Sequence, residues 1–103
     1  MEYRVEVSES ADRDLDAILT YITVELANPK AASDFADELD VKYEVLESNP
    51  LIYELSRNER LANMGYRRFV VKNYVALYQV DEGKRIVTIS RIFYGKQDYE
   101  KHI

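Results

Sequence analysis

Five of the basic side chains in the C-terminal half lie in or directly beside segments whose residues alternate as in β-strands. Arginine keeps its charge at any physiological pH and lysine offers a compact ammonium group, so a set of them on a rigid sheet could hold an anion. Three nearby tyrosines are candidates for surface stacking contacts. The basic residues are Arg67, Arg68, Lys72, Arg91 and Lys96, and the tyrosines are Tyr66, Tyr94 and Tyr99. Two interpretations stay open: a site for an acidic or phosphate-bearing partner, and a charged sheet surface that only resists aggregation.

The charge is distributed unevenly along the chain. Residues 1–56 carry 4 basic and 14 acidic side chains, whereas residues 57–103 carry 10 basic and 5 acidic ones, within a net charge of −5. The absence of cysteine and the single His102, which we interpret as a tail group, exclude a disulfide framework and a thiolate or multi-histidine metal site. At 103 residues, with no signal peptide and no membrane-spanning apolar run, the sequence predicts one cytoplasmic domain.

The C-terminal half predicts three strands in succession. They are rich in Val, Ile, Tyr and Phe, and short turns at residues 72–73 and 81–84 join them, so they should form an antiparallel meander. An alternating segment at the N-terminus predicts a fourth strand. The expected strands are residues 66–71, 74–80, 86–94 and 2–7.

Two amphipathic helices should lie between the first strand and the meander. Ser8 or Ser10 is a suitable N-cap for the first, and Asn28 with Pro29 for the second, which Asn49-Pro50 ends. Their apolar stripes are Ala11, Leu15, Ile18, Ile22 and Leu26, then Ala32, Phe35, Leu39, Tyr43 and Leu46. A helical hairpin on one face of a small sheet, in the order β-α-α-β-β-β, follows: an α+β fold whose opposite face is left free.

The remaining segment, residues 51–64, is irregular in pattern. We expect the apolar Leu51, Ile52, Tyr53 and Leu55 to cover the core edge, and residues 57–60 to be solvated. Tyrosines in apolar patterns are expected in the core, namely Tyr21, Tyr43, Tyr74 and Tyr78.

An ordered set of short motifs resembles the RelE/ParE superfamily of bacterial toxin–antitoxin toxins. The motifs are Gly65-Tyr-Arg-Arg, then Asn73-Tyr-Val-Ala-Leu-Tyr-Gln-Val, then Ile89-Ser-Arg-Ile-Phe-Tyr-Gly-Lys-Gln-Asp, together with the N-terminal Tyr3-Arg4-Val5 and with Asn28-Pro29. The resemblance covers nearly the whole chain and implies one toxin domain. It also implies a cognate antitoxin with an extended, acid-rich segment that adds a helix to the hairpin groove or a strand to the sheet edge.

The RelE branch implies metal-independent cleavage of messenger RNA on the ribosome. There Arg67 and Arg68 would stabilise charge on the phosphate, while Lys96 or Tyr94, with Tyr99 or His102 as other candidates, would move protons. However, Val75 and Gln97 stand where that branch carries arginines. The ParE branch implies inhibition of DNA gyrase by binding, without a cofactor, with Lys72, Arg91, Tyr66 and Tyr99 as candidate target contacts. We favour this second branch slightly; a non-toxic interaction module of the same fold is a further alternative.

Overall fold

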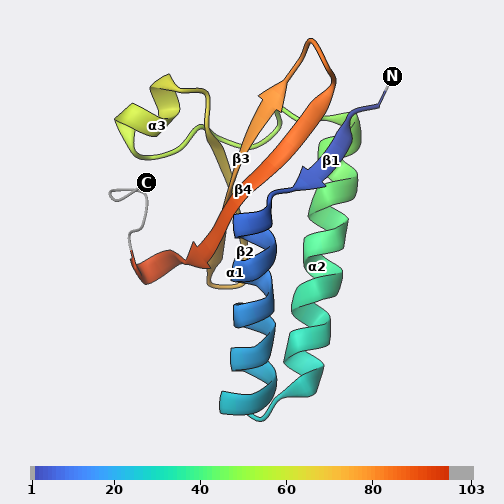
Figure 1. Cartoon of the computed structure of the whole chain (residues 1–103), viewed down its shortest axis with the longest axis vertical. Helices are drawn as coiled ribbons and strands as arrows, with labels where there is room; N and C mark the ends of the chain where they lie inside the picture. Colours follow the sequence, from blue (N-terminus) through green and yellow to red (C-terminus); the bar gives the residue numbers. More distant parts are fainter. Residues whose placement is uncertain (1, 98–103) are drawn as a thin grey trace.

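The computed structural model of the chain describes residues 2–97. One four-stranded sheet in the order β1-β4-β3-β2 has β1 parallel to β4 and the other neighbours antiparallel, and the helices α1 and α2 run beside each other (Figure 1). The strands are β1 (Arg4–Val7), β2 (Arg67–Val71), β3 (Tyr74–Asp81) and β4 (Ile86–Tyr94). The helical segments are α1 (Glu9–Thr20), the π-helix η1 (Tyr21–Glu25), α2 (Pro29–Ser48), α3 (Glu59–Asn63) and the 3₁₀ turn η2 (Gly95–Gln97). The predicted α+β class and element order are confirmed.

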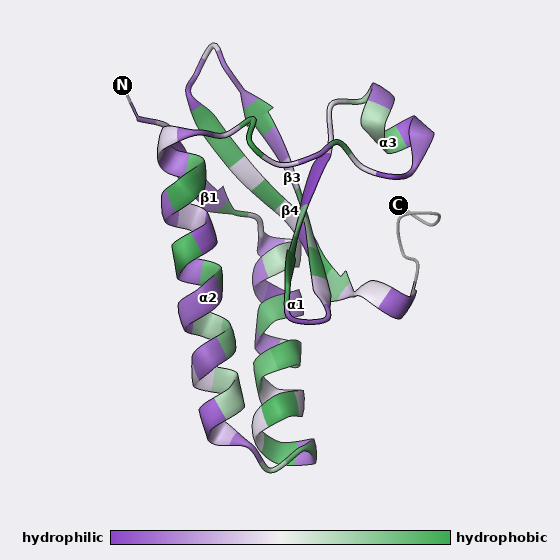
Figure 2. Ribbon diagram, turned by 180° about the vertical axis from the view of Figure 1, so that it is seen from behind, coloured by the Kyte–Doolittle hydropathy of each residue, from purple (hydrophilic) through white to green (hydrophobic). Residues whose placement is uncertain are grey.

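Side-chain caps fix the starts of both long helices. The Ser8 hydroxyl accepts a hydrogen bond from the Ala11 N–H, and the Asn28 side-chain oxygen accepts one from Ala31, with Pro29 in the first turn. Their apolar faces meet one face of the sheet and form the main core (Figure 2). Its largest members are Ile18, Ile22, Phe35, Leu39, Leu46, Phe69, Val71, Tyr78, Ile89 and Ile92.

The opposite face of the sheet is not free, contrary to the sequence prediction. Residues 59–63 form α3, whose N-cap Asn58 accepts from Leu61, and Leu61 packs on Val75, Leu77 and Phe93 to make a second buried cluster. Alternation along β3 sends these residues to the face away from α1 and α2. The helix was not expected because its two apolar residues, Leu61 and Ala62, are adjacent and give no periodic signal.

Several individual expectations about burial are wrong, among them that for Leu26, which was placed in the apolar stripe of the first helix and is 55% exposed. Leu51, Ile52 and Leu55 are exposed, and only Tyr53 of that group is partly buried, because the segment runs along the sheet edge instead of over the core. Tyr21 is 49% exposed, since η1 lies beyond the part of the hairpin that the sheet covers.

The two long helices extend past the sheet, as Figure 1 shows. The tip of the hairpin, where α1 continues into η1 and α2 begins, lies beyond the end of β4 in this view. No helix of residues 2–97 has the length and hydropathy needed to cross a membrane.

Candidate functional site: an aromatic groove between the hairpin and the sheet

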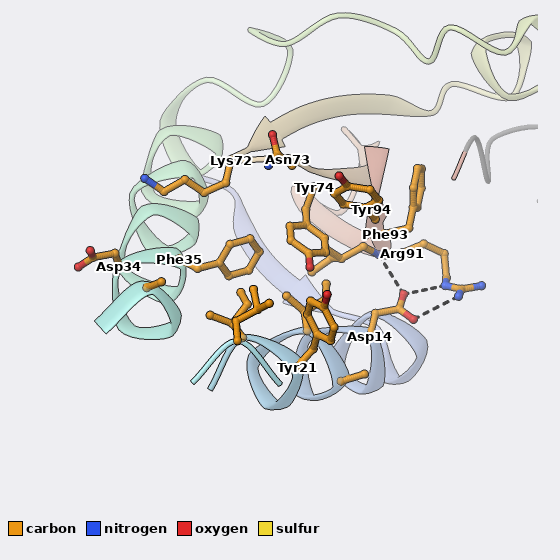
Figure 3. Close-up of a pocket in the computed structure, with 16 residues that line it drawn as sticks. Asp14, Tyr21, Asp34, Phe35, Lys72, Asn73, Tyr74, Arg91, Phe93 and Tyr94 are labelled. Atoms are coloured by element: carbon orange, nitrogen blue, oxygen red, sulfur yellow. Dashed lines mark hydrogen bonds and ion pairs between the residues drawn. The ribbon is translucent and has the colours of Figure 1, made fainter. Parts of the chain in front are cut away.

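A groove of about 860 Å³ lies where the hairpin extends beyond the sheet. Its walls come from α1, η1 and α2 on one side, and from the β2–β3 turn and the end of β4 on the other (Figure 3). Aromatic rings line it: Tyr74 makes edge contacts with Phe35 at 5.3 Å and with Tyr94 at 5.6 Å between ring centroids, and Tyr21 lies on the opposing helix. A mainly apolar concavity with a few polar groups at its edge is the form of a binding site.

Ion pairs border this groove. Arg91 on β4 donates through Nε to Asp14 Oδ2 at 2.8 Å and through Nη2 to Oδ1 at 3.2 Å, a bidentate pair across to α1 (Figure 3). The same carboxylate accepts the main-chain N–H of Ile92 at 2.9 Å. On the α2 side Lys72 pairs with Glu38 at 3.4 Å. The cations that reach the groove are therefore matched by carboxylates of the hairpin.

The two arginines of β2 lie outside the groove. Arg67 donates through Nη1 to the carbonyls of Tyr53 and Leu51, at 2.7 and 3.4 Å. Arg68 is 7% exposed and pairs with Glu54 at 2.9 Å. The hydrogen bond from Arg68, helped by Arg57, lowers the pKa of the Glu54 carboxyl. Adjacent residues of a strand face opposite sides, so Arg67 and Arg68 do not converge on one point.

The structure thus separates the predicted site residues. Lys72, Arg91 and Tyr94 come together at the groove, and Lys96 is exposed in η2 next to it. Tyr66 instead packs on the α3 cluster. Tyr99 and His102 lie outside the described residues.

Several groove residues escaped the sequence prediction. Asp14 was not among the predicted site residues, and Tyr21 and Tyr74 were expected in the core. Spacing along α1 does distinguish Asp14, which lies one turn before Ile18 on the buried side, whereas Asp12 and Asp16 are exposed. Burial, followed by the neighbouring Tyr21 and Tyr94, raises the pKa of the Tyr74 phenol.

Residues 2–97 contain no cluster of three or more histidine, aspartate or glutamate side chains arranged to hold an ion.

Comparison with solved structures finds the same fold in bacterial toxins. The RelBE2 toxin–antitoxin complex from Mycobacterium tuberculosis gives a TM-score of 0.64 at 22% identity, covering 91% of this chain and 99% of that one. The chromosomal ParDE system of P. aeruginosa gives 0.68 at 20% identity, with 89% and 95% covered. A free E. coli RelE mutant gives 0.69 at 15% identity, with 99% and 93% covered. A search of curated proteins found no match.

The chain is thus a small α+β protein with the fold of these RelE and ParE structures. Residues 5–99 match the family described as ParE toxin of type II toxin-antitoxin system, parDE. The chain therefore belongs to the ParE toxin family and is a toxin of the type II toxin–antitoxin class, as the resemblance in its sequence predicted.

Proposed function

We propose that this toxin inhibits DNA gyrase by binding to it, cleaves no RNA, and is neutralised by a cognate antitoxin that covers the groove. The observation that supports the proposal is that the basic residues of the sheet already make ion pairs or hydrogen bonds within the chain. Arg68, Arg91 and Lys72 each pair with a carboxylate of the same chain, and Arg67 is bound to main-chain carbonyls.

Phosphate cleavage would need several of these cations at one point. Catalysis by charge stabilisation depends on donors already aimed at the place where negative charge develops. Here Arg68 would have to leave Glu54, and Arg91 would have to leave Asp14, before either could contact a phosphate. Solvent reaches one partner of each pair, Glu54 at 57% and Arg91 at 43% exposed, so each rearrangement adds a modest cost to phosphate binding.

The position that carries an arginine in the nuclease branch supports the same conclusion. Val75 is 3% exposed and packs in the cluster beneath α3. An arginine there would have to displace Leu61 or bury its charge among apolar side chains. The position at which a nuclease site would carry this arginine is therefore part of the buried cluster beneath α3.

Binding of a protein partner suits the groove better. Lys72 and Arg91 stand at its rim as the proposed gyrase contacts, with Tyr66 and Tyr99 as further candidates from the sequence. Several of the similar structures are toxin–antitoxin complexes. An antitoxin segment seated in the groove would cover Lys72 and Arg91, so that neutralisation would follow from competition for one surface.

Two parallel assays on the purified chain test this proposal. In the first, gyrase supercoils relaxed plasmid with increasing toxin, and we expect loss of supercoiling activity and accumulation of cleaved DNA. In the second, ribosomes translate a defined messenger with the toxin present, and primer extension should find the transcript intact. The double variant Arg68→Ala/Lys96→Ala serves as a control in the second assay, because any true cleavage by the phosphate site would fall sharply in it.

Ribosome-dependent cuts that disappear in the double variant, with gyrase unaffected, would overturn the proposal in favour of the RelE-like alternative. Absence of both activities would instead support the non-toxic module.

A further inference from the structure

The groove carries aromatic rings between two cations, one toward each end. Lys72 lies at the β2–β3 turn on the α2 side, and Arg91 lies on β4 on the α1 side, with Phe35 and Tyr74 between them (Figure 3). The two basic side chains are 58% and 43% exposed, so a ligand in the groove can reach them. Rings flanked by basic residues are the usual composition of a groove for single-stranded nucleic acid.

A carboxylate of the helical hairpin opposes each of these cations. Asp14 on α1 accepts two hydrogen bonds from the Arg91 guanidinium, at 2.8 and 3.2 Å. Glu38 on α2 lies with Oε2 at 3.4 Å from the Lys72 Nζ. Both cations come from the basic C-terminal half of the chain and both carboxylates from the acidic N-terminal half. The fold thus brings opposite charges together at the groove, and these four groups sum to no net charge.

This pairing opposes the binding of phosphate more than the binding of a protein segment. Nucleic acids obtain most of their non-specific affinity from cations that neutralise phosphates. A phosphate beside Arg91 would be repelled at close range by the Asp14 carboxylate, and one beside Lys72 by Glu38. The apolar side chains of a protein segment pack on the aromatic rings without that repulsion. The two carboxylates therefore favour one class of ligand over the other.

We propose that Asp14 and Glu38 determine the specificity of the groove: they neutralise the two cations, so that the groove excludes single-stranded nucleic acid and accepts protein. This inference rests on the proposed function, because it takes the target to be a protein, and it names the residues that exclude the other class of target. Both ion pairs are partly exposed to solvent, so each is expected to lower the affinity for a phosphate-bearing strand by a factor of about three.

Neutral substitutions separate the charge of these carboxylates from their other contacts. Asp14 also accepts the Ile92 N–H at 2.9 Å, and Asp14→Asn keeps a side-chain oxygen for that bond. The Glu38 side chain is 38% exposed, and Glu38→Gln keeps its length and its hydrogen-bonding capacity. The double variant Asp14→Asn/Glu38→Gln thus removes two negative charges from the groove while both cations stay.

Two other carboxylates of the same helices supply a matched control. Asp16 on α1 and Glu44 on α2 are exposed, and neither forms an ion pair within residues 2–97. Asp16→Asn/Glu44→Gln changes the net charge by the same amount as Asp14→Asn/Glu38→Gln. Any difference in binding between the two double variants therefore comes from the position of the charges.

Fluorescence anisotropy of the full chain measures the effect, with a fluorescein-labelled oligouridylate of about 12 nucleotides as the probe. We expect Asp14→Asn/Glu38→Gln to bind about tenfold more tightly than the unmodified chain, and the control variant to stay within about twofold of it. The slope of log affinity against log salt should steepen by about 1.4, because two more phosphates are neutralised at about 0.7 each. Adding Lys72→Gln/Arg91→Gln should abolish the gain, which a partly unfolded chain would retain.

A gain of the same size in the control variant would mean that net charge alone sets the affinity, and a gain that survives Lys72→Gln/Arg91→Gln would place the strand elsewhere; each result overturns the inference. Equal binding by the unmodified chain and by Asp14→Asn/Glu38→Gln would overturn it as well. The target is tested separately: gyrase that stays active with the unmodified toxin would refute the proposed function, whereas the anisotropy comparison bears only on which charges exclude nucleic acid.

Discussion

Removing the Asp14 carboxylate should weaken the hold of α1 on the end of β4. The side chain is 19% exposed and accepts three hydrogen bonds, two from Arg91 and one from the Ile92 N–H. The Arg91 side chain is 43% exposed, so solvent reduces the worth of the pair to about 1 kcal/mol. An unsatisfied Ile92 N–H adds about 1–2 kcal/mol. Asp14→Ala should therefore lower the free energy of unfolding by about 2–3 kcal/mol.

Two companion variants separate the parts of this effect. Asp14→Asn keeps an oxygen for the Ile92 N–H and loses the charge, so it should cost only about 1 kcal/mol. Asp16→Ala removes an exposed carboxylate from the same helix and should change stability by less than about 0.5 kcal/mol.

Urea unfolding followed by far-ultraviolet circular dichroism gives all three values, because the chain has no tryptophan to report by fluorescence. If Asp14→Ala and Asp16→Ala had the same free energy of unfolding within error, the argument that the Asp14 carboxylate holds α1 to the end of β4 would be refuted.

Three further predictions concern buried and paired groups. The Tyr43 hydroxyl is buried and has no hydrogen-bond partner in the described part of the chain, so in thermal unfolding Tyr43→Phe should be neutral or stabilising by up to about 1 kcal/mol. The Tyr78 hydroxyl donates to the Pro50 carbonyl at 2.9 Å, so Tyr78→Phe should be destabilising by about 1 kcal/mol. Burial raises the pKa of Tyr78 to about 12 from an ordinary 10, so stability should hold below pH 10 and fall as the pH rises through 12; a fall that Tyr78→Phe did not reduce would count against this origin. The pKa of Glu54 is lowered by Arg68, so its contribution is present above the ordinary carboxyl range and lost as the pH falls below it, and acid titration of Glu54→Gln should show a shallower loss than the unmodified chain.

The sequence predicted the parts of the fold that local periodicity controls. Stripes such as Ile18 with Ile22 and Phe35 with Leu39 determine which side of each helix is buried, and strand alternation does the same for Phe69 and Val71. These patterns repeat within a few residues, so they are legible without the tertiary structure.

The groove and its ion pairs depend on features that lie far apart in the chain. Arg68 is buried because the Glu54 segment pairs with the β2 edge, and Arg91 is neutralised by a carboxylate 77 residues away. The groove lies where the hairpin extends beyond the end of the sheet. The composition indicated that the C-terminal half, which forms most of the sheet, is basic. Only the contacts in the structure show that Arg68, Lys72 and Arg91 are paired with carboxylates.

The π-helix η1, which follows α1 in the hairpin, affects which side chains face the groove. A π turn arises when one extra residue is accommodated inside an α-helix, which shifts every later side chain by about 100° around the axis. The segment Tyr21–Glu25 lies at the edge of the core, so losing that extra residue would turn the exposed Tyr21 and Val24, and also the buried Ile22, to new directions. Losing or gaining one residue at the hairpin tip would therefore reshape the wall of the groove at a cost in core packing at Ile22.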